Sequence, residues 1–179
     1  MPAEEKVPTL LSGEVDALLS YVINGPAIEA GEAEKGWTAR ELFWADFGFD
    51  MASNGFVVSE RLLDERPDVV RRFLRATYRG VSWALSHPVE AADLFSERNP
   101  RIDQGLARLQ WKRTIPFIVT DDSRRDGLGF LPGEKLEETL RALGRGGAES
   151  AEAVHSNDFL PDKDIRLPPQ SAGAPSETS

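Results

Sequence analysis

The sequence predicts an α/β fold that has fewer strands than a complete sheet requires. Three short apolar runs, rich in aromatic residues, valine and leucine, favour strands. Around them, apolar residues recur every three or four positions, which is the period of one face of a helix. Proline, glycine and asparagine mark the ends of most of these segments. The pattern gives about three strands and about six or seven helices.

The elements before residue 60 alternate between helix and strand. A short helix is predicted over residues 8–13. Residues 26–36 form the next helix, because Pro26 has a helical φ at its first position and Gly36 can end it. The predicted strands are residues 17–22, 42–47 and 55–59.

A long helical block follows the third strand. Ser59 is expected to cap a helix over residues 60–65, because its hydroxyl can accept a hydrogen bond from a free amide at the helix start. Pro67 begins the next helix, which ends near His87 and Pro88. One further helix runs from Pro88 towards Pro100, and later helical segments follow, the last of which opens at Pro132.

The helix that begins at Pro67 has one apolar face and one basic face. Its apolar residues predict a surface helix packed on a core. In this helical phase we expect Phe73 and Leu74 to be buried, and Arg71 and Arg75 to be exposed. We interpret the four arginines as a solvated helix face paired with nearby carboxylates, with a basic patch as the alternative; they are Arg71, Arg72, Arg75 and Arg79.

Three stretches of sequence carry a resemblance to a known family. They are LLSGEVDALLSYVINGP, VSERLLDERPDVVRRFLRATYRGVSWALSHPVEAADLF and SNDFLP, and together they cover most of residues 8–161. In this order they resemble the solute-binding proteins of ABC importers for nitrate, sulfonates, taurine and the pyrimidine precursor of thiamine. SNDFLP is similar to the ending of the pyrimidine-precursor branch.

The resemblance implies a type 2 periplasmic-binding-protein fold, in which crossover strands join two α/β lobes. The chain would supply the later part of one lobe, the crossover and the C-terminal completion of the other. We therefore expect residues 1–167 to form a partial solute-binding-protein-like α/β domain. Residues 168–179 are predicted to be a disordered tail, because they offer too little apolar surface to offset the entropy of ordering.

A partial sheet would expose unpaired strand edges and apolar faces. We expect a missing N-terminal lobe or self-association to cover them, and the alternative is that the chain is a truncated gene product. No basic region followed by an apolar core occurs at the N-terminus, so no signal peptide is predicted in this chain. The resemblance nevertheless implies a periplasmic or extracytoplasmic location.

The composition excludes several classes of function. Of 179 residues, 40% are hydrophobic and 28% are charged, which is typical of a globular protein, and no apolar run reaches the length of a membrane span. The net charge of −9 argues against a nucleic-acid partner, which would need a basic surface. The absence of cysteine excludes disulfides, thiolate catalysis and zinc–thiolate sites.

The first candidate ligand site lies at the end of the first predicted strand, where ligands bind in open α/β sheets. It contains Ser20, Tyr21 and Asn24. The tyrosine ring can stack on a flat heterocycle, and the asparagine amide can donate and accept hydrogen bonds at its edge. The alternative is a core tyrosine and a turn asparagine. In the resembled pyrimidine-precursor branch an acidic residue stands where this sequence has Gly25, which puts a pyrimidine ligand in doubt.

The second candidate site lies between the second and third predicted strands. Its aromatic rings alternate with carboxylates and could line a pocket for a small cationic or heteroaromatic ligand, although core aromatics and loop carboxylates explain the same pattern. The residues are Trp44, Asp46, Phe47, Phe49, Asp50 and Asn54.

Candidate catalytic residues are few. Neither His87 nor His155 has a serine or aspartate partner at a known motif spacing, and Asp121 with Asp122 makes a weak metal site without further spaced ligands. We expect no cofactor. A related fungal family that makes the thiamine pyrimidine carries a cysteine-rich motif that is missing here.

The sequence therefore favours a binding protein over an enzyme. The resemblance implies the substrate-binding component of an ABC importer, which captures a small organic or anionic ligand and presents it to an ABC permease. The alternatives are an enzyme of thiamine-pyrimidine biosynthesis and a truncated remnant that does not transport.

Overall fold

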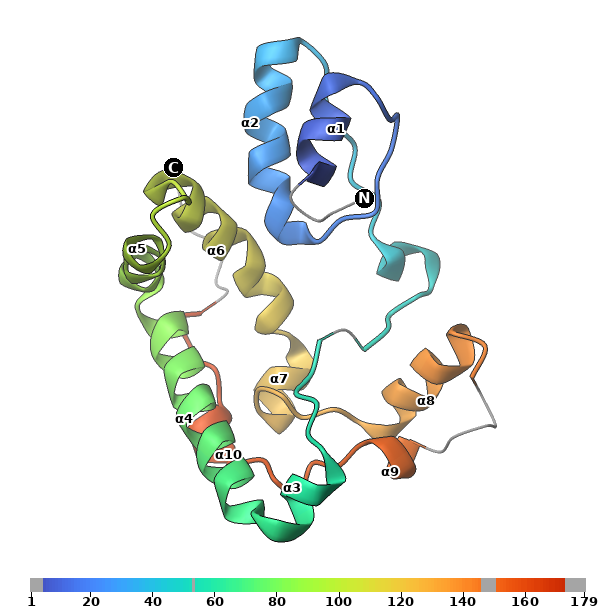
Figure 1. The fold of residues 1–179 in the computed structure, drawn as a ribbon, viewed down its shortest axis with the longest axis vertical. Coiled ribbons are helices and arrows are strands. Elements are labelled where there is room, and N and C mark those ends of the chain that lie inside the picture. Colours follow the sequence, from blue (N-terminus) through green and yellow to red (C-terminus); the bar gives the residue numbers. More distant parts are fainter. Residues whose placement is uncertain (1–4, 53, 146–150, 173–179) are drawn as a thin grey trace. The chain divides into compact units, whose positions relative to one another are not determined.

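The computed structural model describes residues 5–52, 54–145 and 151–172, and all regular elements in these ranges are helices (Figure 1). Elements labelled η are 3-10 helices. In order they are α1 (Lys6–Ser12), η2 (Val22–Asn24), α2 (Gly25–Lys35), η3 (Trp44–Phe47), α3 (Glu60–Glu65), α4 (Pro67–Ser86), α5 (Pro88–Arg98), α6 (Gln104–Ile118), α7 (Asp121–Asp126), α8 (Gly133–Ala142), α9 (Ala151–Val154) and α10 (Lys163–Arg166).

None of the three predicted strands is a strand in the structure. Residues 17–21 and 55–59 are irregular, and most of residues 42–47 form η3. The backbone of Tyr21, Phe43 and Ser59 is nevertheless extended. An extended segment becomes a strand only when a neighbour completes its ladder of hydrogen bonds, and no ladder occurs within the described ranges. The strand predictions are wrong because the apolar pattern cannot supply the pairing partner.

The chain divides into two compact units. Unit 1 consists of Met1–Glu41, Ala84–Ile118 and Ser171–Ser179, and unit 2 consists of Leu42–Trp83 and Val119–Gln170. Residues 170–172 form a turn in which Ala172 is buried, and the remainder of the predicted tail, residues 173–179, lies outside the described residues.

Unit 1 is built around α6. Helices α5 and α2 and the short η2 pack on α6, and α1 packs on α2. Arg108 of α6 donates two hydrogen bonds, of 2.6 and 2.7 Å, to the Asp93 carboxylate of α5. These bonds lower the pKa of Asp93 below its ordinary value. Gly31 of α2 lies against the Leu11 side chain, where a Cβ would clash, so the glycine lets α1 and α2 approach closely.

Unit 2 has its core along one face of α4. Val70, Leu74 and Tyr78 are buried on this face, at intervals of four residues. The Tyr78 hydroxyl and ring lie where a Cβ of Gly129 would stand, and Gly129 has a left-handed φ of +77°. Burial raises the pKa of the Tyr78 phenol above its ordinary value, and the charge of Arg166 opposes part of this shift.

Arg166 of α10 closes the same core. It is only 6% exposed, and its guanidinium donates to the backbone oxygens of Pro161, Asp126 and Leu128 at 2.8, 3.3 and 2.9 Å. The Leu128 amide donates back to the Arg166 carbonyl at 2.8 Å. Because each buried carbonyl needs a donor, this one side chain holds together the loop after α7 and the segment before α10.

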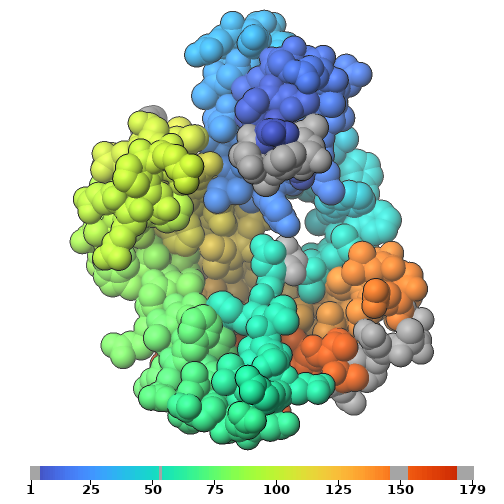
Figure 2. Space-filling view, in the orientation of Figure 1, coloured from blue at the N-terminus to red at the C-terminus, as the bar shows by residue number. Residues whose placement is uncertain are grey.

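Helix α8 anchors one distant segment of unit 2, residues 50–52. Ala52 N donates to the Thr139 hydroxyl at 2.8 Å, and Lys135 pairs with Asp50 at 2.8 Å. Helix α9 packs against α8, and the two surfaces lie side by side in Figure 2. Asn157 exchanges two hydrogen bonds with the backbone of Leu131.

The helical phase predicted for α4 is correct for Leu74, Arg71 and Arg75, but wrong for Phe73. Leu74 is buried and both arginines are exposed, whereas Phe73 is 55% exposed. The buried stripe follows Leu74, and Phe73 lies about 100° away from Leu74 around the helix. Its ring contacts that of Phe56 edge to face, with 5.4 Å between centroids. Phe73 therefore belongs to an aromatic pair at the surface.

Candidate ligand-binding site

Ser20, Tyr21 and Asn24 lie in unit 1, on the segment immediately before α2. Asn24 Nδ2 donates to Ser20 Oγ at 2.8 Å. The Tyr21 side chain is 65% exposed, so the alternative of a core tyrosine is wrong. Asn24 stands at the N-cap position of α2 but makes no side-chain capping bond there. The structure thus presents an exposed aromatic ring three residues before an amide that a hydrogen bond orients.

An ion-pair cluster adjoins this group. Arg113 of α6 pairs with Glu29 of α2 at 2.8 Å and also with Glu41. The three side chains carry a formal net charge of −1, from two carboxylates and one guanidinium. The cluster therefore places a net negative charge close to the backbone of Gly25, the residue that follows Asn24.

Gly25 leaves room for this ion pair. A Cβ at Gly25 would lie 2.9 Å from Glu41 Oε1 and 3.0 Å from Arg113 Nε. Both distances are shorter than ordinary van der Waals contacts, so any side chain at this position would move the pair. The glycine that departs from the pattern of the pyrimidine-precursor branch is the residue that lets the Glu41 carboxylate approach the backbone at the start of α2.

Arg113 and Glu41 were not predicted from the sequence. They are 72 residues apart, and neither belongs to a motif. The sequence signal was the glycine before Pro26, because glycine allows another group to come close to the backbone, and the structure shows that Gly25 is buried.

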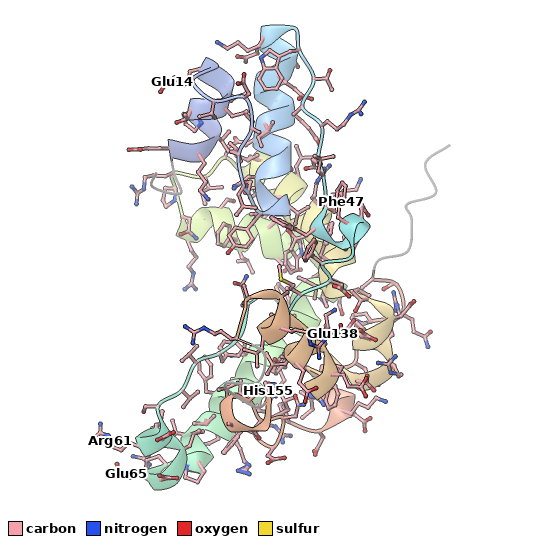
Figure 3. The ribbon with its side chains drawn as sticks, turned by 90° about the vertical axis from the view of Figure 1, so that its right-hand side faces the viewer. Glu14, Phe47, Arg61, Glu65, Glu138 and His155 are labelled. Atoms are coloured by element: carbon pink, nitrogen blue, oxygen red, sulfur yellow. The ribbon has the colours of Figure 1, made fainter. Side chains whose placement is uncertain are left out.

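The second predicted set belongs to unit 2 and forms a less complete site. Trp44 and Phe49 contact each other edge to face, with 5.8 Å between ring centroids. Asp50 is already paired with Lys135. Asp46 lies in the first turn of η3, Asn54 is exposed, and Phe47 of the same η3 is 63% exposed (Figure 3). This segment presents aromatic rings, but the Asp50 carboxylate forms an ion pair that stabilises the fold.

The candidate catalytic residues do not form a recognisable centre in the described part of the chain. Asp121 and Asp122 lie in the first turn of α7, and Asp122 pairs with Arg125 at 2.8 Å. His155 follows α9 (Figure 3). Within residues 5–52, 54–145 and 151–172, no three histidine, aspartate or glutamate side chains gather as metal ligands. None of the helices in those ranges combines the length and apolar character of a membrane span.

Comparison with known proteins identifies the class of the chain. Residues 2–91, which are half of the chain, match the family described as NMT1/THI5 like. The chain belongs to this family, as the resemblance indicated. The family implies a periplasmic-binding-protein-like fold, but the described helices do not confirm its α/β character.

Three curated relatives of the chain have names that state a ligand or an activity. A riboflavin-binding protein of Chloroflexus aurantiacus is 31% identical over 85% of this chain and 44% of the relative. A 4-amino-5-hydroxymethyl-2-methylpyrimidine phosphate synthase of Legionella pneumophila is 37% identical over 35% of this chain and 20% of the relative. A putative aliphatic sulfonates-binding protein of Bacillus subtilis is 37% identical over 41% of this chain and 23% of the relative.

The matched region spans less than half the length of each of these relatives. Two of the three are named as binding proteins and one is named as a synthase. No solved structure matches the chain.

Proposed function

We propose that this chain is part of a solute-binding protein that captures a small heteroaromatic molecule and delivers it to an ABC permease outside the cytoplasm. The observation that carries the proposal is the exposed ring of Tyr21 on the same short segment as the Asn24 amide, which a hydrogen bond to Ser20 holds in place. An aromatic face with a neighbouring donor and acceptor is the usual means of holding a flat, nitrogen-containing ring. Membership in the NMT1/THI5-like family supports small-molecule binding as the general role.

The ion-pair cluster favours a neutral or cationic ring over an anion such as a sulfonate or nitrate. Its net negative charge lies next to Gly25, the residue that follows Asn24. Glu41 would then accept hydrogen bonds from the N–H groups of the ligand, in the place where the pyrimidine-precursor branch has its own acidic residue. Two relatives are named for riboflavin and for a substituted pyrimidine, which are both nitrogen heteroaromatics.

A second candidate function is an enzyme of thiamine-pyrimidine formation. The observation that favours it is the 37% identity to the Legionella pneumophila synthase over 35% of this chain. The binding role is preferred because, of these three matches, the one that covers most of this chain, 85%, is to a protein named for binding.

A ligand panel distinguishes these functions. Calorimetry on the 179-residue chain would compare riboflavin, 4-amino-5-hydroxymethyl-2-methylpyrimidine, taurine and nitrate, with chromatography of each compound after incubation. Binding of one heteroaromatic compound without product is expected. Tighter binding of taurine or nitrate would contradict the ligand class, and product formation would support the enzyme. A chain that binds none of these compounds would support the alternative of a truncated remnant that does not transport.

A further inference from the structure

A surface groove in unit 2 is lined by arginines on one side and by apolar residues on the other. Its volume is about 310 Å³. Helix α4 contributes the arginines, and the segment before α10 contributes the opposite wall. The lining residues are Arg71, Arg72, Arg75, Phe159, Leu160, Pro161 and Asp162. The groove shares no residue with the Tyr21 group, and its function does not depend on the function proposed there.

Arg71 is held over the ring of Phe159. Its Cζ atom lies 4.8 Å from the ring centroid, which is a cation–π contact. Such a contact positions the guanidinium without using its N–H groups. The donors of Arg71 therefore remain available for an anion in the groove.

Arg75 is a second available cation, whereas Arg72 is not. Arg72 Nη2 lies 2.9 Å from Asp68 Oδ2, so its charge is already paired. Arg75 lies one helical turn after Arg71, on the same face, and makes no ion pair with the described residues. The interpretation of the arginines as a face paired with carboxylates is thus correct for Arg72 but does not extend to Arg71 and Arg75.

The local charge is positive although the chain is acidic. The three lining arginines carry three positive charges, and Asp68 and Asp162 carry two negative charges. The net charge of these five groups is +1, whereas the net charge of the whole chain is −9. Two unpaired arginines one turn apart repel each other. An oxoanion placed between them would remove this repulsion and could accept hydrogen bonds from both guanidinium groups.

We propose that this groove binds a small aromatic oxoanion, meaning a phosphate monoester or carboxylate on a single ring. The oxoanion lies between Arg71 and Arg75, and the ring lies against Leu160 and Pro161. The volume is at the lower end of the range for small-molecule sites, about 300–1,000 Å³, which suits one ring and one charged group. Asp162 on the same wall disfavours ligands with a second distant negative charge.

Titration with simple probes tests this proposal. Calorimetry at low salt would compare phenyl phosphate, benzoate, inorganic phosphate and phenol. Phenyl phosphate is expected to bind most tightly, benzoate and inorganic phosphate more weakly, and phenol without measurable heat. Absence of phenyl phosphate binding, or phenol binding as tightly as phenyl phosphate, would overturn the proposal.

Matched variants locate the binding. Arg75→Gln should lower the affinity for phenyl phosphate by about five- to tenfold, after allowance for the solvent exposure of this arginine. Arg79→Gln removes an exposed arginine of the same helix that does not line the groove, and should leave the affinity unchanged. Equal losses in both variants would show a general charge effect and reject the site. Tyr21→Ala is expected to have no effect, and a loss there would assign the probe to the Tyr21 group instead.

Discussion

Gly25 in unit 1 and Gly129 in unit 2 both stand where a side chain would meet another group, but the two groups differ. At Gly25 the neighbours are the ends of the Glu41 and Arg113 side chains, which can rotate away. At Gly129 the neighbour is the buried Tyr78 ring, and the backbone also has a left-handed φ of +77°. One glycine therefore permits an adjustable polar cluster, and the other permits a fixed core.

The largest expected effect is that of Gly129→Ala. A left-handed alanine costs about 1–2 kcal/mol, and forcing a methyl group onto the Tyr78 ring costs about 1–3 kcal/mol more. We expect a loss of about 3 kcal/mol in the free energy of unfolding, or roughly 6–12 °C in the melting temperature. Thermal melts followed by circular dichroism would measure it. A melting temperature within about 2 °C of the parent would show that Tyr78 moves freely, which would remove the distinction between the two glycines.

The buried Tyr78 should also make stability fall at high pH. Its folded pKa is raised above the ordinary value, so the unfolded chain loses the phenol proton first and unfolding becomes more favourable as the pH rises beyond about 10. Below that pH the contribution is fully present. Urea unfolding of the parent and of Tyr78→Phe across this range would test it. The variant should lose less stability than the parent as the pH rises. Parallel curves of unfolding free energy against pH would contradict the assignment of this pH dependence to Tyr78.

The segment of residues 42–57, which contains η3, differs from both glycine sites because several of its apolar side chains are exposed to solvent. Leu42, Phe47 and Val57 are among its exposed residues. Exposed apolar surface of this kind marks an interaction site or an aggregation liability. We expect the isolated chain to associate, and expect Phe47→Ser combined with Val57→Ser to reduce association. Sedimentation velocity would follow this, and a parent chain that remains monomeric at all concentrations would refute it.

The smallest expected effect on stability is that of Gly25→Ala. The backbone at this position is right-handed helical, with φ of −50°, so alanine is compatible with it. The cost of moving two flexible side-chain ends is offset by the lower entropy of the unfolded chain, and the net change should stay within about 0.5 kcal/mol. The affinity for a heteroaromatic ligand should nevertheless fall, because Glu41 moves. A destabilisation as large as that of Gly129→Ala would show that the cluster is rigid.

The sequence predicted the helices better than the strands for a physical reason. Helix signals are local: Ser59 Oγ accepts from Leu62 N at 3.3 Å as expected of a cap, and α4 begins at Pro67. A strand requires a partner that the local pattern cannot name, and residues 55–59 have extended character without one.

In the candidate site, too, local features could be predicted from the sequence and long-range contacts could not. Ser20, Tyr21 and Asn24 are close in sequence, and the Asn24 amide donates to the Ser20 hydroxyl, but their role as a ligand site stays a prediction. Arg113 and Glu41 meet across 72 residues, which only the tertiary packing of α6 on α2 determines.

The exposure of Phe73 was not predicted, because a wide apolar stripe does not show which of its edges the core covers.

The affinity difference between Tyr21→Ala and Trp37→Ala tests the central claim most directly. Trp37 is also an exposed aromatic residue of unit 1, but it follows the opposite end of α2. Calorimetry with the heteroaromatic compound that binds the parent should show a loss of about 1–3 kcal/mol for Tyr21→Ala, from the lost stacking surface, and no change for Trp37→Ala. Unchanged affinity in Tyr21→Ala, or equal losses in two variants that melt like the parent, would contradict a ligand site at Tyr21.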